Sequence, residues 1–117
     1  MTTSIDPTTT SAWSALSTHH KSLTPNLREW FAADPERAQK LSFTADELHV
    51  DLSKNLITSE TVELLVKLAE EVKLEQAREA MFSGEHINVT ENRAVLHTAL
   101  RRPEGYTPAL TVDDQDV

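Results

Sequence analysis

The fold of this chain depends most on the stretch TSETVELLVKLAEEV, residues 58–72. Its apolar residues recur at intervals of three and four, which is the period of a helix with one buried face. Thr58 can cap the first turn, and Glu60 places a negative charge at the positive end of the helix dipole. The stretch therefore predicts an amphipathic helix. Its buried stripe is expected to contain Val62, Leu65, Val66, Ala69 and Val72.

The helical pattern continues beyond this stretch in a slightly shifted register. Leu74, Ala77 and Met81 extend it. Gly84 then provides a natural stop, because glycine readily adopts the left-handed conformation that ends helices.

Three short helices are predicted nearer the amino terminus, after a polar arm of residues 1–10 that is interrupted by Pro7. Ser11 can cap the first helix, and Pro25 ends it. Asp34 and Pro35 suit the N-cap and first position of the third. The residues expected on one face of the first helix are Trp13, Leu16, His20 and Leu23, and the apolar positions expected in the second and third helices are Leu27, Trp30 and Phe31, and Ala38 and Leu41.

Two segments show the patterns of short strands. Residues 48–53 alternate between apolar and polar, and the residues around Phe43 can supply an antiparallel partner, which predicts a hairpin. Residues 109–112 predict a strand, and Asp113-Asp114 predicts a turn into another extended piece. That piece has only begun at Val117, so we expect the sequence to be part of a longer chain.

A last helix is predicted from Thr90 to about Arg101, before Pro103. On this helix Arg93 and His97 would lie one turn apart, at the edge of the apolar arc. A permanent cation beside an imidazole can hold a phosphorylated or hydroxylated ligand, and the imidazole can relay a proton. The same pair could equally satisfy a carboxylate or a backbone carbonyl at a domain interface.

Composition excludes several classes of function. The 117 residues carry a formal charge of −8 with a pI near 5.0, which disfavours nucleic acid as a partner. No cysteine is present, so disulfides and thiolate metal sites are absent. The apolar runs are far shorter than the roughly 20 residues of a membrane span. The first ten residues resemble no signal or transit peptide, so we expect a cytoplasmic protein.

The remaining motifs predict no ligand, metal or cofactor site. The two glycines do not form a phosphate loop. His19 and His20 are adjacent and are expected at the surface, while His49 and His86 have no second ligand at suitable spacing. The sequon Asn88-Val89-Thr90 is expected to cap the helix after it, and the acidic residues 113–116 to form a solvated turn rather than a calcium loop.

Three blocks resemble the amino-terminal region of the glucose-6-phosphate isomerase family, also called phosphoglucose isomerase. The longest is MFSGEHINVTENRAVLHTALR, residues 81–101. An earlier block, VDLSKN at residues 50–55 with Thr58 downstream, has Leu52 where the family more often has Tyr. A later block, VDDQDV at residues 112–117, has Asp114 where Gly is common. The blocks follow the family's order and spacing, and the resemblance covers nearly the whole chain.

The resemblance implies a fold and an activity. The chain would be about the first fifth or quarter of an enzyme with two three-layer α/β sugar-isomerase domains, assembled as a homodimer with its active site between domains and subunits. Residues 11–117 would form an α+β segment of mostly short helices and a small antiparallel hairpin around those domains. The reaction implied is the interconversion of glucose 6-phosphate and fructose 6-phosphate through an enediolate, in glycolysis and gluconeogenesis, without a metal or other cofactor.

The family's main catalytic groups have no counterparts in this segment. Only Arg93 and His97 match positions close to the substrate pocket, so we expect the segment alone to be inactive. Two alternatives stay open on the residues themselves. The chain could be a free-standing acidic helical module that binds a partner through its apolar stripes, or it could self-associate through them.

Overall fold

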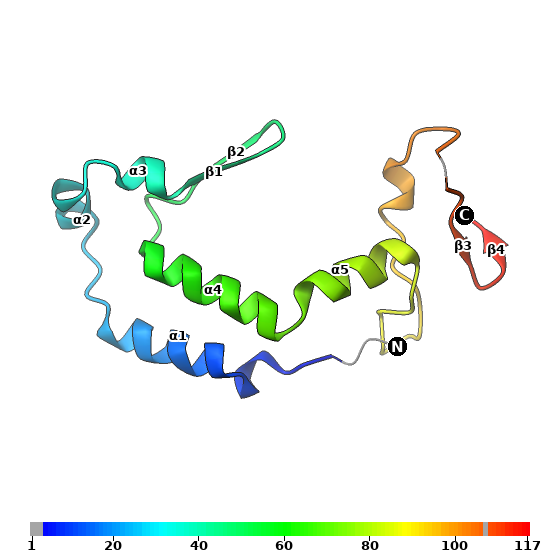
Figure 1. Cartoon of the computed structure of the whole chain (residues 1–117), viewed down its shortest axis with the longest axis horizontal. Helices are drawn as coiled ribbons and strands as arrows, with labels where there is room; N and C mark the ends of the chain where they lie inside the picture. The colour runs from blue at the N-terminus through cyan, green and yellow to red at the C-terminus, as the bar shows by residue number, and fades with distance from the viewer. Residues whose placement is uncertain (1–3, 107) are drawn as a thin grey trace. The chain divides into compact units, whose positions relative to one another are not determined.

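The computed structural model describes residues 4–106 and 108–117, and it consists of short helices and two two-stranded antiparallel sheets (Figure 1). The predicted α+β class is therefore confirmed. The described residues pack as two compact units, one formed by Pro7–Glu71 and the other by Val72–Val117 with residues 4–6.

The first unit contains most of the helices. In chain order its elements are η1 (Pro7–Thr9), α1 (Ser11–Ser22), α2 (Leu27–Ala33), α3 (Arg37–Lys40), β1 (Ser42–Ala45), β2 (Leu48–Asp51) and α4 (Ser59–Glu71). Of the arm predicted for residues 1–10, residues 1–3 lie outside the described residues.

Helix α1 begins differently from the prediction, because its cap is Thr10 and not Ser11. The Thr10 side chain accepts a hydrogen bond from the backbone N–H of Trp13 at 3.2 Å. Ser11 instead donates its hydroxyl proton to Oε1 of Glu71, at 2.5 Å. Serine and threonine can both cap a helix. Here the Ser11 hydroxyl is bonded to the distant Glu71 carboxylate, and Thr10 forms the cap.

Helices α1 and α4 lie antiparallel and side by side (Figure 1). At one end the Ala12 N–H donates to Glu71 at 3.1 Å, and at the other His19 Nε2 lies 2.7 Å from Thr61 Oγ1. Ala12, His19 and Thr61 are the buried residues of this helix pair. The two helices thus meet through small and polar side chains.

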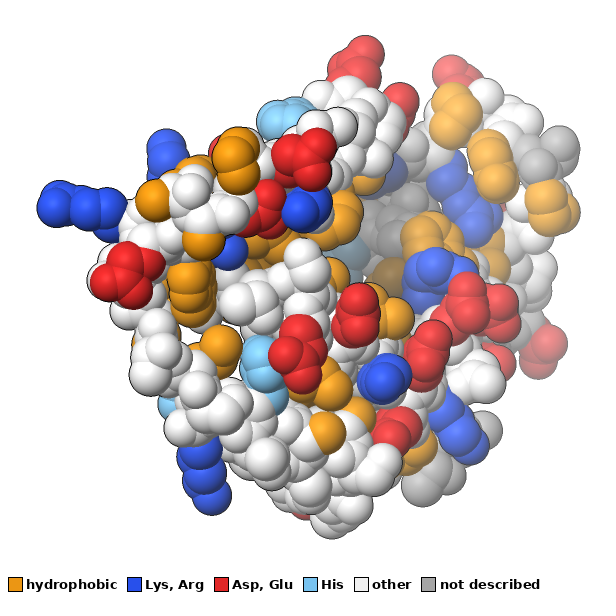
Figure 2. Space-filling model, turned by 60° about the vertical axis from the view of Figure 1, so that its left-hand side comes forward, with side chains coloured by type: hydrophobic (Ala, Val, Ile, Leu, Met, Phe, Trp, Pro, Cys, Tyr) orange, Lys and Arg blue, Asp and Glu red, His pale blue; other side chains and the backbone are white. Residues whose placement is uncertain are grey.

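This contact overturns the predicted burial of both helices. In α1 the apolar face is not the buried one, and Trp13 stays 41% exposed. In α4 the predicted stripe is only partly covered, because Leu65 and Val66 are 47% and 53% exposed while Val62 and Ala69 are half-buried. Figure 2 shows hydrophobic side chains at the surface among acidic and basic ones. Periodicity identified the apolar faces correctly but not what packs on them.

The centre of the rest of this unit is Arg37, which is buried at 6% exposure. Its Nε donates to the Ser53 carbonyl at 2.9 Å, and its Nη2 donates to the carbonyls of Asn55 and Ile57 at 3.1 and 2.9 Å. Its guanidinium also lies 4.9 Å from the centroid of the Trp30 ring. One cation therefore fastens the segment before α4 to α3.

The hairpin is confirmed, and so is the start of α4. Strands β1 and β2 pair antiparallel, with Phe43 opposite Val50. The Thr61 N–H donates to the Thr58 hydroxyl at 3.4 Å, so Thr58 caps α4 as predicted. The third helix is shorter than predicted: Asp34 accepts from the Glu36 N–H in a turn, and α3 begins only at Arg37.

The second unit contains α5 (Leu74–Ser83), η2 (Ala99–Arg101), β3 (Thr111–Val112) and β4 (Gln115–Asp116). Gly84 ends α5 in the left-handed conformation, with φ 81°, as predicted. The predicted turn at Asp113 and Asp114 is also confirmed, and φ angles of 51° and 62° match the mirror-image turn that suits a two-residue hairpin.

The helix predicted from Thr90 to Arg101 is wrong, since only the single 3₁₀ turn η2 forms there. The side-chain Oδ1 of Asn88 accepts from the Thr90 hydroxyl at 2.8 Å and from the Glu91 N–H at 3.2 Å. Such local bonds offer the backbone an alternative to a helix. Asn92 then turns the chain with a φ of 52°. Asn88 thus organises a turn instead of capping a helix.

In the part of the chain that the structure describes, no helix combines the length and the apolar character needed to cross a membrane.

Candidate functional site

The two sequence-predicted site residues, Arg93 and His97, lie in the segment between α5 and η2 of the second unit. Both are exposed. Because the segment is not helical, they do not stack one turn apart as predicted. Neither side chain makes a hydrogen bond or ion pair with the residues described, so both are available to a ligand or to another part of a larger protein.

Arg93 is held by its backbone. Its N–H donates to the Asn88 carbonyl at 3.2 Å, and its own carbonyl accepts from the Asn88 N–H at 3.1 Å, which forms an isolated antiparallel bridge. The turn of residues 88–93 is therefore closed at its base, directly where the Arg93 side chain leaves the backbone.

His86 joins this turn to the β3–β4 turn. Its Nδ1 lies 3.1 Å from Oδ1 of Asn92, and its Nε2 lies 3.0 Å from both carboxylate oxygens of Asp113. The His86 side chain is 28% exposed, against 70% for Asp113. The prediction for His86 concerned a second metal ligand at suitable spacing, whereas the hydrogen-bonded link to Asp113, 27 residues further along the chain, was not predicted.

These contacts favour the protonated imidazole. The hydrogen bond to Asn92 and that to Asp113 raise the pKa of His86, and the negative charge of Asp113 adds to the rise, while desolvation opposes it. A protonated ring donates from both nitrogens, and each nitrogen here faces an oxygen.

Gly84 allows the β3–β4 hairpin to approach the end of α5. A Cβ at this position would collide with the Val112 side chain and would also contact Leu110 and Leu96. The positive φ separately favours glycine. Gly84 is thus required both for the helix end and for the close approach of Val112 to it.

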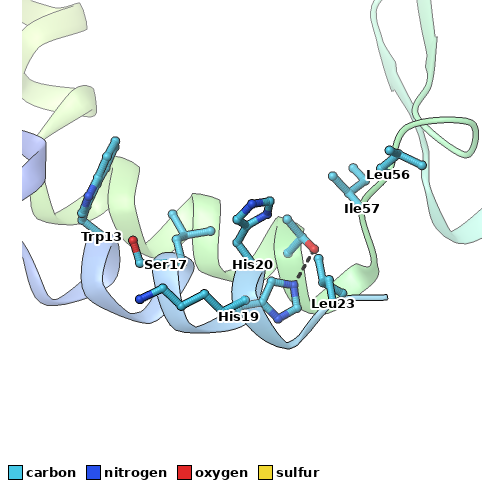
Figure 3. Close-up of a pocket in the computed structure, with 10 residues that line it drawn as sticks. Trp13, Ser17, His19, His20, Leu23, Leu56 and Ile57 are labelled. Atoms are coloured by element: carbon cyan, nitrogen blue, oxygen red, sulfur yellow. Dashed lines mark hydrogen bonds between the residues drawn. The ribbon is translucent and has the colours of Figure 1, made fainter. Parts of the chain in front are cut away.

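A separate open cavity of about 390 Å³ lies in the first unit, between α1, the start of α4 and the segment before it. Trp13, Leu23 and Ile57 supply apolar walls, with His20 at the rim (Figure 3). His19 bonds to Thr61 there and is 8% exposed. The expectation that His19 is a surface residue is therefore wrong. It is a satisfied buried histidine.

A metal site has no basis in the described ranges, where no group of three or more histidine or acidic side chains is arranged to hold an ion.

Comparison with known proteins decides the family. A family model described as phosphoglucose isomerase matches residues 51–117, which is more than half of the chain. The chain belongs to the phosphoglucose isomerase family. The matched range includes the turn of residues 88–93, the His86 link and both Arg93 and His97.

Individual relatives in this family extend the match over nearly the whole chain. It is 55% identical over 113 residues to a glucose-6-phosphate isomerase of Corynebacterium kroppenstedtii and 52% identical over 115 residues to one of Bifidobacterium longum, in each case over 96% of this chain. A glucose-6-phosphate isomerase of Mycolicibacterium smegmatis is 51% identical over 115 residues, 97% of the chain. The chain spans about a fifth of the length of these relatives.

The phosphoglucose isomerase blocks contained the residues of the His86 link without revealing it. His86 and Asn92 fall in the longest block, and Asp113 falls in the last. No periodicity connects positions 27 apart in sequence. The one local signal was the predicted two-residue turn, which fixes Asp113 at the tip of a hairpin.

Proposed function

We propose that this chain is the amino-terminal part of an enzyme that interconverts glucose 6-phosphate and fructose 6-phosphate by proton transfer through an enediolate. The observation that carries the proposal is the family match, together with relatives named glucose-6-phosphate isomerase that are more than 50% identical over nearly the whole chain. The complete enzyme is a cytoplasmic homodimer that acts in glycolysis and gluconeogenesis and needs no metal.

In this proposal Arg93 and His97 contribute to the substrate pocket of the complete enzyme. Both side chains are exposed and make no internal bond within the described residues. A guanidinium suits the oxygens of a sugar phosphate, and an imidazole can donate to a sugar hydroxyl or relay a proton. The Asn88–Arg93 bridge fixes the backbone of one of them, which lowers the entropy lost on binding.

A coupled assay that follows fructose 6-phosphate formation tests the proposal. The full reading frame containing this chain should be active, whereas the isolated 117 residues should not, since the main catalytic groups lie outside them. Activity in the isolated chain, or none in a folded full-length product, would contradict it. A reading frame that stops at Val117 would favour a partner-binding module that uses the exposed Leu65 and Val66.

Single substitutions test the two pocket residues. Arg93→Ala and His97→Ala should each raise the KM for glucose 6-phosphate or lower kcat in the full-length enzyme, with unfolding unchanged. Arg101→Ala and His49→Ala are matched controls, because both residues are exposed and lie outside the proposed pocket. Unchanged kinetics in both pocket variants would refute this role.

A further inference from the structure

We propose that His86 is a positioning residue, whose imidazole clamps the turn of residues 88–93 to the β3–β4 turn and so fixes the backbone that presents Arg93 to a sugar phosphate. The inference rests on the proposed function. It concerns a residue that contacts neither the substrate nor the reacting atoms in that proposal.

The geometry carries the inference. The bond from His86 to Asn92 reaches the residue directly before Arg93, at 3.1 Å, and the bonds to Asp113 reach the tip of the other turn, at 3.0 Å. Asn92 has a φ of 52°, in the left-handed region that asparagine enters more readily than most other non-glycine residues and that reverses the chain direction here. The clamp therefore acts on the tightest point of the turn that carries Arg93.

The clamp depends on protonation. Within the described residues the charged group that contacts the imidazole is Asp113, from the β3–β4 turn, and the group that faces it from its own segment is the neutral amide of Asn92. Protonated His86 donates to both. After deprotonation one ring nitrogen loses its proton and faces an oxygen, so one contact is lost unless the Asn92 amide turns over.

The direction of the pH effect follows from the raised pKa of His86. The clamp is complete at low pH and weakens as the pH rises through the pKa of the folded state. A lysine at this position keeps a positive charge and several donors to higher pH. His86→Lys is therefore the conservative variant, and His86→Leu removes the clamp.

The first measurement is independent of catalysis. Amide hydrogen exchange on the full chain should show that the Arg93 N–H, which donates to Asn88, exchanges faster in His86→Leu and is protected again in His86→Lys. Asp113→Asn should speed exchange of the Arg93 N–H as His86→Leu does. The variant that combines both substitutions should exchange no faster than either single variant. His49→Leu, an exposed histidine of the other unit, is the matched control. Equal Arg93 protection in all variants would overturn the clamp.

The second measurement is the kinetics of the full-length enzyme. His86→Leu should raise the KM about 3- to 10-fold at low pH, the range expected for one lost hydrogen bond, while kcat changes little. The ratio of the wild-type KM to that of His86→Lys should rise with pH. Loss of kcat with unchanged KM would show a purely structural role and overturn the inference. A folded wild type without isomerase activity would refute the proposed function instead, and exchange at Arg93 would still decide the clamp.

Discussion

Replacing Arg37 with methionine should destabilise the first unit by roughly 3 kcal/mol. Methionine keeps an unbranched apolar stem, but it cannot form the three hydrogen bonds that the guanidinium donates to carbonyls. The Ser53 carbonyl belongs to a residue that is 1% exposed, and leaving such an acceptor unpaired costs about 1–3 kcal/mol. The carbonyls of Asn55 and Ile57 lie nearer the solvent, so losing their hydrogen bonds costs less stability. The cation–π contact with Trp30 adds about 0.5–1 kcal/mol.

The assay for this prediction uses a reporter that the molecule already contains. With Trp13→Phe as the parent, Trp30 is the remaining tryptophan, and its ring lies 4.9 Å from the Arg37 guanidinium. Urea unfolding of the 117-residue chain, in which Trp30 is then the single tryptophan, is followed by its emission and extrapolated to water. Lys40→Met is the matched control: this exposed cation of α3 should cost at most about 1 kcal/mol. A loss below roughly 0.5 kcal/mol for Arg37→Met would refute the reasoning.

Three further substitutions test contacts within one unit or the other. Gly84→Ala should cost at least about 1–2 kcal/mol in urea unfolding, because the new methyl group meets Val112 and the backbone is left-handed; a neutral result would contradict that packing. Thr61→Val should cost about 1–3 kcal/mol, since it leaves Nε2 of buried His19 unpaired; equal stability would mean that water replaces the hydroxyl. The hydroxyl and backbone N–H at the start of α1 lower the pKa of Glu71, so its stabilisation is complete above its unfolded pKa and is lost as the pH falls through the folded value. Glu71→Gln should flatten that acid dependence in unfolding midpoints measured across pH, and an unchanged profile would exclude the contact.

Features governed by neighbouring residues could be predicted from the sequence. The Thr58 cap, the Gly84 stop and the Asp113-Asp114 turn each depend on the conformational preference of one or two residues. The hairpin at residues 42–51 followed from a period of two in the same way. All four appear in the structure where the pattern placed them.

Features that depend on distant partners could not be predicted. The helix expected from Thr90 failed because Asn88 bonds its neighbours locally, and a helical wheel does not register such competition. Without that helix, Arg93 and His97 are not held one helical turn apart. His86 gained a carboxylate 27 residues away, and Arg37 gained three carbonyls from the segment before α4. Those pairings are decided by tertiary structure.

Few amino acids can replace the two residues at the tip of the β3–β4 turn. Asp113 and Asp114 both hold a backbone conformation that β-branched and bulky side chains enter only with strain. In a saturation library selected for folded protein, position 114 should retain mainly Asp, Asn and Gly. Positions 111 and 115, on the exposed strands, should accept many residues. Position 113 has two requirements. A substitute must adopt the left-handed backbone conformation, and it must also supply a negatively charged acceptor for His86.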